Sequence, residues 1–103
     1  MTDFDTAIAS VCKAAKVKRS AMISSSREWP NVEARHLLVL LLSRKQFKDG
    51  IIADIICRKR VTVVKSRQTA NLLLSTSSVF RSKFDKAQSI YEETIKSLRL
   101  ANG

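Results

Sequence analysis

The chain has 103 residues, of which 45% are hydrophobic, and its 19 Lys and Arg against 9 Asp and Glu give a formal net charge of +10. A chain of this length holds one hydrophobic core, so we expect a single domain over residues 1–103. The longest hydrophobic run, residues 37–42, is far below the roughly 20 residues that a membrane-spanning helix needs. The opening residues are acidic rather than basic and apolar, so we expect a cytoplasmic protein with no membrane partner.

Metal, cofactor and catalytic sites are not expected. The chain has one histidine, His36, and its two cysteines, Cys12 and Cys57, lie far apart, so a zinc ion would lack ligands. Both cysteines are predicted to be small core residues in a reducing compartment. No carboxylate pair, nucleophile with a base or glycine-rich phosphate loop is present, and Asp49 and Asp54 are interpreted as capping and surface residues. The sequence therefore predicts neither an enzyme nor a bound cofactor.

The chain contains two glycines and one proline, which favours an all-α fold of five to six helices. Asp3 or Thr6 is expected to cap a first helix that ends near Ala15. After a break, Ser20 is expected to cap one short helical turn. Residues 24–30 are predicted to form a loop because serines and a proline dominate them.

Pro30 favours an extended conformation for Trp29 and suits the start of a third helix, predicted over residues 31–44. Hydrophobic residues cover nearly the whole circumference of this helix, which predicts a central position with neighbours on several sides. Trp29, the only tryptophan, is interpreted as a core residue or a staple against the helix rather than a platform for a ligand. His36 is expected at the margin of the buried surface.

Residues 49–74 are predicted to form two helices around a turn at residues 57–59. Four isoleucines at helical spacing give the first helix one hydrophobic stripe, with Asp49 as its cap. The second helix, predicted over residues 60–74, has a hydrophobic inner face and a polar, basic outer face. A short helix, a tight turn and a longer helix that begins with cations is the order of a helix-turn-helix, in which the second helix enters the DNA major groove. The inward positions of the second helix, by spacing, are Val63, Ser66 or Arg67, Ala70, Leu73 and Leu74.

A last helix is predicted over residues 82–98, after a linker at residues 75–78. Phe80 is expected to pack as a staple before this helix, and one of the linker hydroxyls is expected to cap it. Hydrophobic residues recur on one face of the helix at the spacing of a buried stripe. These residues are Phe84, Ala87, Tyr91, Ile95 and Leu98.

The positive charge is unevenly distributed. Cations concentrate in residues 13–27, 35–48 and 58–67, whereas residues 85–99 are nearly balanced. This pattern indicates an electrostatic surface for a polyanion. The cluster at residues 58–60 is the strongest indication of a polyanion partner. Cations at a helix N-terminus are unfavourable to the helix macrodipole unless an anion binds there. The alternatives are a basic protein without such a partner and, for the cluster, an ordinary solvated helix end.

Four short segments carry a resemblance to a known family. The segments are Lys16-Val17-Lys18 followed by Met22-Ile23-Ser24-Ser25; Ala34-Arg35-His36-Leu37; Arg58-Lys59-Arg60-Val61-Thr62-Val63-Val64-Lys65-Ser66; and Phe80-Arg81-Ser82-Lys83-Phe84. In their order and spacing, over about residues 4–90, they resemble the C-terminal DNA-binding domain of the bacterial replication initiator DnaA, in a small stand-alone form. The resemblance implies a helix-turn-helix of the kind shared by that domain and the Trp repressor, with double-stranded DNA as the partner.

The chain also departs from the family pattern. Lys59-Arg60-Val61 replaces Asp-His-Thr, and Ile56-Cys57 replaces two glycines. Because the family uses the first of these stretches to contact bases, the DNA sequence that the family recognises is not carried over. There is no Walker A motif, so the ATPase of the full initiator is absent. We expect a nucleoid-associated protein that serves transcription regulation or aids replication.

The resemblance also implies roles for individual residues. Arg and Lys can bind guanine O6 and N7, and Val can contact a thymine methyl group. Arg27 falls in the loop that, in the family, places an arginine in the adjacent minor groove. The expected base-contacting residues are Lys59, Arg60, Val61 and Lys65, and the expected backbone or minor-groove residues are Lys18, Arg27, Arg35, Lys48, Arg58, Thr62 and Gln68.

A second hypothesis gives the chain a different class of function. The last helix, with its stripe of Phe84, Tyr91, Ile95 and Leu98, would dock a protein partner or a second copy of the chain. A buried stripe predicts a monomer, and an exposed one predicts association that depends on concentration. The two functions are compatible, since many helix-turn-helix proteins dimerise.

Overall fold

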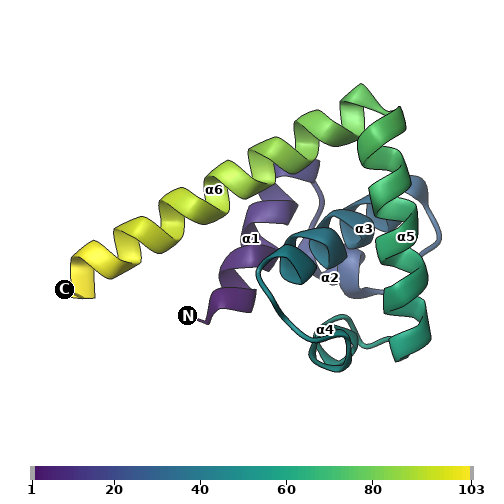
Figure 1. Ribbon diagram of the computed structural model, residues 1–103, viewed down its shortest axis with the longest axis horizontal. Coiled ribbons are helices and arrows are strands. Elements are labelled where there is room, and N and C mark those ends of the chain that lie inside the picture. Colours follow the sequence, from purple (N-terminus) through teal and green to yellow (C-terminus); the bar gives the residue numbers. More distant parts are fainter. Residues whose placement is uncertain (1, 103) are drawn as a thin grey trace.

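The protein is built from six helices, as a computed structural model describing residues 2–102 shows (Figure 1). The described residues contain no β-strand, which confirms the predicted all-α class of five to six helices. The helices are α1 (Asp3–Ala15), α2 (Arg19–Ile23), α3 (Trp29–Arg44), α4 (Asp49–Ile56), α5 (Arg60–Thr76) and α6 (Ser78–Asn102).

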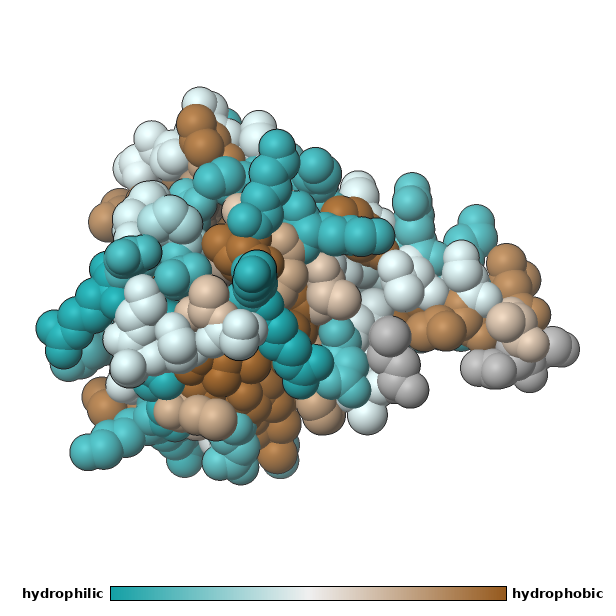
Figure 2. Space-filling view, turned by 180° about the vertical axis from the view of Figure 1, so that it is seen from behind, coloured by the Kyte–Doolittle hydropathy of each residue, from teal (hydrophilic) through white to brown (hydrophobic). Residues whose placement is uncertain are grey.

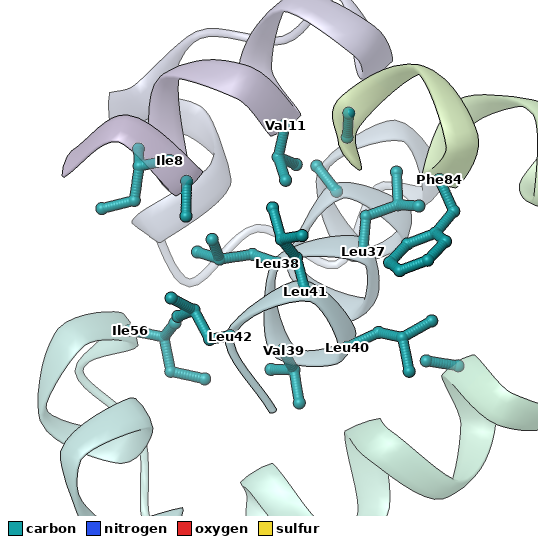
Figure 3. Close-up of a cluster of buried hydrophobic side chains, with 14 of the residues drawn as sticks. Ile8, Val11, Leu37, Leu38, Val39, Leu40, Leu41, Leu42, Ile56 and Phe84 are labelled. Carbon is teal, nitrogen blue, oxygen red and sulfur yellow. The ribbon is translucent and has the colours of Figure 1, made fainter. Parts of the chain in front are cut away.

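Helix α3 is the centre of the core, as its all-round hydrophobicity predicts. It contacts each of the other five helices. Residues 37–42 are all buried, so neighbouring positions on opposite sides of α3 face different partners. In Figure 3 the Leu38 side chain points to the side of α3 on which Ile8 of α1 lies, whereas Val39 and Leu40 point away from α1. A helix that fills the middle in this way leaves the surrounding helices to carry the exposed surface.

The first two helices begin at other residues than predicted. Thr2 caps α1 in a capping box: its Oγ accepts a hydrogen bond from the Asp5 amide at 3.3 Å, and Asp5 accepts one from the Thr2 amide at 3.4 Å. Asp3 therefore lies in the first turn of the helix and Thr6 is buried within it. Helix α2 has Lys18 as its N-cap, and Ser20 is exposed inside the helix instead of capping it.

Helix α3 begins at Trp29, two residues before the predicted start. Pro30 occupies its first turn, where the missing N–H costs no intrahelical hydrogen bond. Trp29 is 51% exposed, so its assignment to the core is wrong. Trp29 and His36 lie seven residues apart in one helix and therefore share a face. That face is the partly exposed margin of α3, where the two rings are 6.3 Å apart.

A single residue, Ser77, separates α5 from α6, where a four-residue linker was predicted. Its Oγ accepts a hydrogen bond from the Phe80 amide at 3.1 Å, so a serine of this stretch does cap the last helix. Phe80 belongs to the first turn of α6 and is buried, rather than preceding the helix as a staple. The Arg81 side chain donates to the carbonyls of Leu74 and Ser75 and so satisfies the end of α5.

Helix α6 packs along α1 and continues beyond it (Figure 1). Its 25 residues correspond to a rod of about 37 Å, close to the 40 Å length of the molecule. Its first half is buried through Phe84, Ala87 and Tyr91, whereas Leu98 is 36% and Leu100 is 74% exposed. Figure 2 shows hydrophobic residues on the projecting end of this helix. No helix within residues 2–102 is long and apolar enough to cross a membrane.

The prediction that both cysteines lie in the core is wrong for Cys57. Cys12 is half-buried against the core, but Cys57 is exposed. Cys57 ends α4 in the left-handed conformation, with φ 56° and ψ 46°. The turn is closed by hydrogen bonds from the Cys57 amide to the Asp54 carbonyl at 3.3 Å and from the Arg58 amide to the Ala53 carbonyl at 2.9 Å. Its position in a helix-ending turn, rather than hydrophobic neighbours in sequence, decides its exposure.

Candidate nucleic-acid interface

Residues 57–59 join helices α4 and α5, whose inner faces are buried in the core. The buried residues are Ile52, Ala53 and Ile56 of α4 and Val63, Ser66 and Ala70 of α5.

Asp49 was predicted to cap α4, but the N-cap is Lys48. Asp49 instead accepts two hydrogen bonds from Arg67 of α5, one of them at 3.0 Å. These hydrogen bonds hold the pKa of Asp49 below its ordinary value. The start of α4 is therefore fixed to the middle of α5.

The outer face of α5 is exposed over its first three turns. Val61 is 56% exposed, and the polar and charged residues around it are exposed as well. Within residues 2–102, neither Arg60 nor Lys65 takes part in an ion pair; the cations that do are Arg19, Lys45, Arg67 and Lys83. This exposed face consists of Lys59, Arg60, Val61, Thr62, Lys65, Gln68 and Thr69.

Helices α4 and α5 both begin at a lysine that makes no side-chain cap. Lys48 precedes α4 and Lys59 precedes α5, and the first turn of α5 holds no acidic residue. The first amides of a helix have no intrahelical acceptor and carry partial positive charge, so cations at this position are unfavourable by themselves. An oxyanion would accept from these amides and meet the lysine and arginine charges at the same time.

A groove of about 340 Å³ runs beside the start of α5. It lies between α3, the turn at residues 57–59 and the loop of residues 24–28, which we call the serine loop. Three arginines and several hydroxyl groups face it, and no aspartate or glutamate lines it. We call it the basic groove; its lining residues are Ser25, Ser26, Arg27, Val32, Arg35, His36, Ile56, Arg58, Thr62 and Ser66.

The serine loop is held by its own side chains. Ser24 Oγ donates to the Ala21 carbonyl at 2.7 Å and accepts from the Ser26 amide at 3.2 Å. Ser26 Oγ accepts from the Glu28 amide at 3.2 Å and from the Asn31 side-chain amide at 3.1 Å. Such local side-chain bonds replace the backbone ladder that a helix or strand would supply. The loop is therefore held by four side-chain hydrogen bonds, which composition alone did not predict.

Two arginines bind the backbone of this loop from outside. Arg35 Nη1 donates to the carbonyls of Met22 at 2.8 Å and Ser24 at 3.0 Å, and its Nη2 donates to the carbonyl of Ser26. Arg58 also donates to the Ser24 carbonyl, and to the carbonyl of Cys57 at 3.2 Å. Burial, followed by the nearby Arg58 charge, lowers the pKa of Arg35.

His36 and Ser66 form a polar contact that sequence analysis missed. The Nδ1 atom of His36 lies 2.6 Å from Ser66 Oγ, which links α3 to α5 at the floor of the basic groove. Burial lowers the pKa of His36, the Arg35 charge lowers it further, and the Glu33 charge opposes both. The sequence places His36 at the margin of the buried surface and Ser66 or Arg67 on an inward face, which does not pair the two residues.

The structure brings some of the predicted site residues together and leaves others apart. Arg27, Arg35, Arg58 and Thr62 line the basic groove, and Arg27 is exposed on the serine loop. Lys59, Arg60, Val61, Lys65 and Gln68 lie on the exposed face of the adjoining helix α5. Lys48 is exposed at the start of α4, and Lys18, exposed before α2, does not line the groove.

Within residues 2–102, no three histidine, cysteine or acidic side chains gather as a metal site would require. Comparison of the chain with protein families, with curated proteins and with solved structures found no match.

Proposed function

We propose that this protein binds double-stranded DNA, with α4 and α5 acting as a helix-turn-helix and α5 entering the major groove. The observation that carries the proposal is the start of α5. It presents Lys59 and Arg60 beside free helical amides, it has no acidic residue in its first turn, and its cations are not paired within residues 2–102. Charge placed against the helix dipole in this way is favourable when a phosphate is present.

The exposed face of α5 would read the bases. Arg60 and Lys65 would bind guanine O6 and N7, and Val61 would contact a thymine methyl group. Lys59 would reach a base edge or a phosphate. Because Val63, Ser66 and Ala70 are buried on the other side of the helix, the exposed face can only turn outward.

The DNA backbone would be bound around this face. Lys48 would meet one phosphate, and Thr62 and Gln68 others, while Arg27 would reach the adjacent minor groove. Lys18, exposed before α2, would add to the positive charge that attracts DNA. A protein of this kind would act in the nucleoid, as a transcription regulator or an aid to replication without ATPase activity of its own.

The experiment is a selection of bound sequences from random duplexes at two salt concentrations. We expect a shared motif at low salt that persists, with lower recovery, at high salt, because base contacts specify while phosphate contacts weaken with salt. The matched control is the Arg60→Ala variant, which should recover a motif degenerate at one position. Recovery of no shared motif at either salt concentration would overturn sequence-selective binding.

A second candidate function is self-association through the end of α6. Ile95 is half-buried and Leu98 and Leu100 are exposed there, and residues 85–99 carry nearly balanced charge in a chain of net charge +10. Two copies could meet at this segment with little electrostatic repulsion. The test is the mass in solution as a function of concentration. Leu98→Glu should keep the chain monomeric. The control Leu72→Glu, at another exposed leucine, should leave association unchanged. A native chain that is monomeric at every concentration would rule this function out.

A further inference from the structure

We propose that Arg35 and Arg58 are positioning residues that lock the serine loop, and with it Arg27, to the start of α5. This inference rests on the proposed DNA binding and refines it, because the resemblance implies that both arginines contact DNA themselves. In the structure, their guanidinium groups are turned onto the protein backbone instead.

The terminal nitrogens of both arginines are engaged. Both terminal nitrogens of Arg35 donate to carbonyls, and so do both terminal nitrogens of Arg58. A phosphate that bound both terminal nitrogens of either guanidinium would have to displace these carbonyls. Arg27, on the same groove, is exposed and remains available to a ligand.

The carbonyls require donors of this kind. Met22 and Ile23 end α2, and Ser24 follows as its C-cap, so their carbonyls have lost the intrahelical partner that the next turn would supply. These carbonyls accept partly buried hydrogen bonds from the two arginines. A polar group left unpaired in such a place costs more than the bond itself contributes. A guanidinium spreads its donors over two terminal nitrogens in a rigid fork and so spans carbonyls that lie apart, whereas the three donors of a lysine share one nitrogen.

The geometry joins three parts of the chain at one atom. The Ser24 carbonyl accepts from Arg35 of α3 and from Arg58 of the turn before α5. The positive charges of Arg35 and Arg58 both meet this carbonyl oxygen. A cluster of carbonyl dipoles, rather than a carboxylate, offsets the repulsion between the two charges. The serine loop therefore moves as one body with the turn, and the distance from Arg27 to the exposed face of α5 is fixed before DNA binds. Preorganisation of this kind lowers the entropy lost on binding.

The first test uses the free protein and needs no DNA. Arg35→Lys and Arg58→Lys keep the charge but remove the fork. We expect hydrogen exchange of the Ser26 and Glu28 amides to rise about tenfold, with the core of α5 unchanged. The matched control is Arg81→Lys, which removes the same kind of arginine–carbonyl bonds at the far end of α5 and should leave the serine loop unchanged. Unchanged exchange in both loop variants would overturn the lock.

The second test uses a selected DNA site. Arg58→Lys should weaken binding about tenfold in the native chain and by less than about twofold when Arg27 is already alanine, because the arginine acts through Arg27. Equal losses in both backgrounds would show that Arg58 contacts DNA directly and would overturn the positioning role. If the native chain bound no duplex, the DNA function would fail, while the exchange measurements would still decide whether the loop is locked.

Discussion

Arginine and lysine side chains in this protein fall into two groups with different partners. Arg35, Arg58 and Arg67 donate to carbonyls or to a carboxylate, and each joins two elements of the fold. Arg60 and Lys65 are exposed on α5 and form no ion pair within residues 2–102. Charge alone does not separate these two groups, because the difference lies in the contacts that each side chain makes in the fold.

Substitution of Arg60 should change specificity. We expect Arg60→Ala to cost about 1 to 3 kcal/mol in binding to a selected site and to relax selectivity at one base pair, since Arg binds guanine in a bidentate manner. Lys48→Ala should instead weaken binding to all duplexes alike, because a phosphate carries no sequence information. Titration of a set of single-base variants of the site checks both. An equal loss on every duplex for Arg60→Ala would place Arg60 on the backbone.

Stability should fall in mild acid because of His36. Its pKa in the folded protein is lowered from 6.5, so below pH 6.5 the unfolded state takes up a proton that the folded state does not. The contribution of His36 to the free energy of unfolding is therefore fully present above about pH 6.5. It is lost as the pH falls toward the folded-state pKa of His36, by at most about 1.4 kcal/mol per pH unit. Urea unfolding between pH 7.5 and 5.5 measures it. His36→Gln should abolish the dependence in this window; persistence of the slope would assign it to another group.

At the scale of elements, the turn between α4 and α5 contains a strained residue. Cys57 is exposed and has φ 56°, a conformation that costs a side chain with a Cβ about 1 kcal/mol or more. We expect Cys57→Gly to stabilise the protein by about 0.5 to 1 kcal/mol, after the greater entropy of glycine in the unfolded chain is subtracted. Thermal unfolding measures the change.

The matched control is Asp54→Gly, at an exposed position inside α4. It should destabilise the protein by about 1 kcal/mol, the ordinary helical cost of glycine. Lys16→Gly, at φ 58° after α1, should behave like Cys57→Gly. A loss of stability for Cys57→Gly would mean that the thiol contributes packing that its exposure does not indicate.

The presence of each helix was more predictable from the sequence than the residues at which it begins and ends. Hydrophobic periodicity and the expected capping residues together predict all six helices, and the all-round hydrophobicity of α3 predicts its central position. The break between α5 and α6 was misjudged because a run of serines is typical of a linker. In the structure, the hydroxyls of Ser75 and Thr76 donate to the Leu72 carbonyl and Arg81 supplies donors from the next helix, so α5 continues. Bonds of this kind depend on elements that a local pattern does not contain.

At the scale of the whole molecule, the excess of positive charge should dominate the salt dependence of binding. If six phosphates are neutralised, the logarithm of the affinity should fall with the logarithm of salt concentration with a slope of about −5. Lys48→Ala should reduce the magnitude of this slope by about 1. Lys96→Ala, on the far part of α6, should leave it unchanged. Binding that does not respond to salt would contradict the proposed interface.

The candidate site was predictable only in part. The exposed face of α5 follows from its own periodicity, because Val63, Ser66 and Ala70 must turn inward. The basic groove does not, since it depends on contacts between distant parts of the chain. Arg58 and Ser24 are 34 residues apart in sequence, and no local pattern pairs a cation with a backbone carbonyl. Tertiary packing therefore determines which arginine side chains remain available to a ligand.

The nearly continuous passage from α5 into α6 has a practical consequence. With one residue, Ser77, between the two helices, α6 carries its last turns away from α4 and the start of α5, as Figure 1 shows. A fluorescent dye attached near Leu100 would sit clear of a docked duplex and report its approach through energy transfer from a labelled strand. Tagging or surface immobilisation at that tip should likewise leave the opposite end of the protein unobstructed.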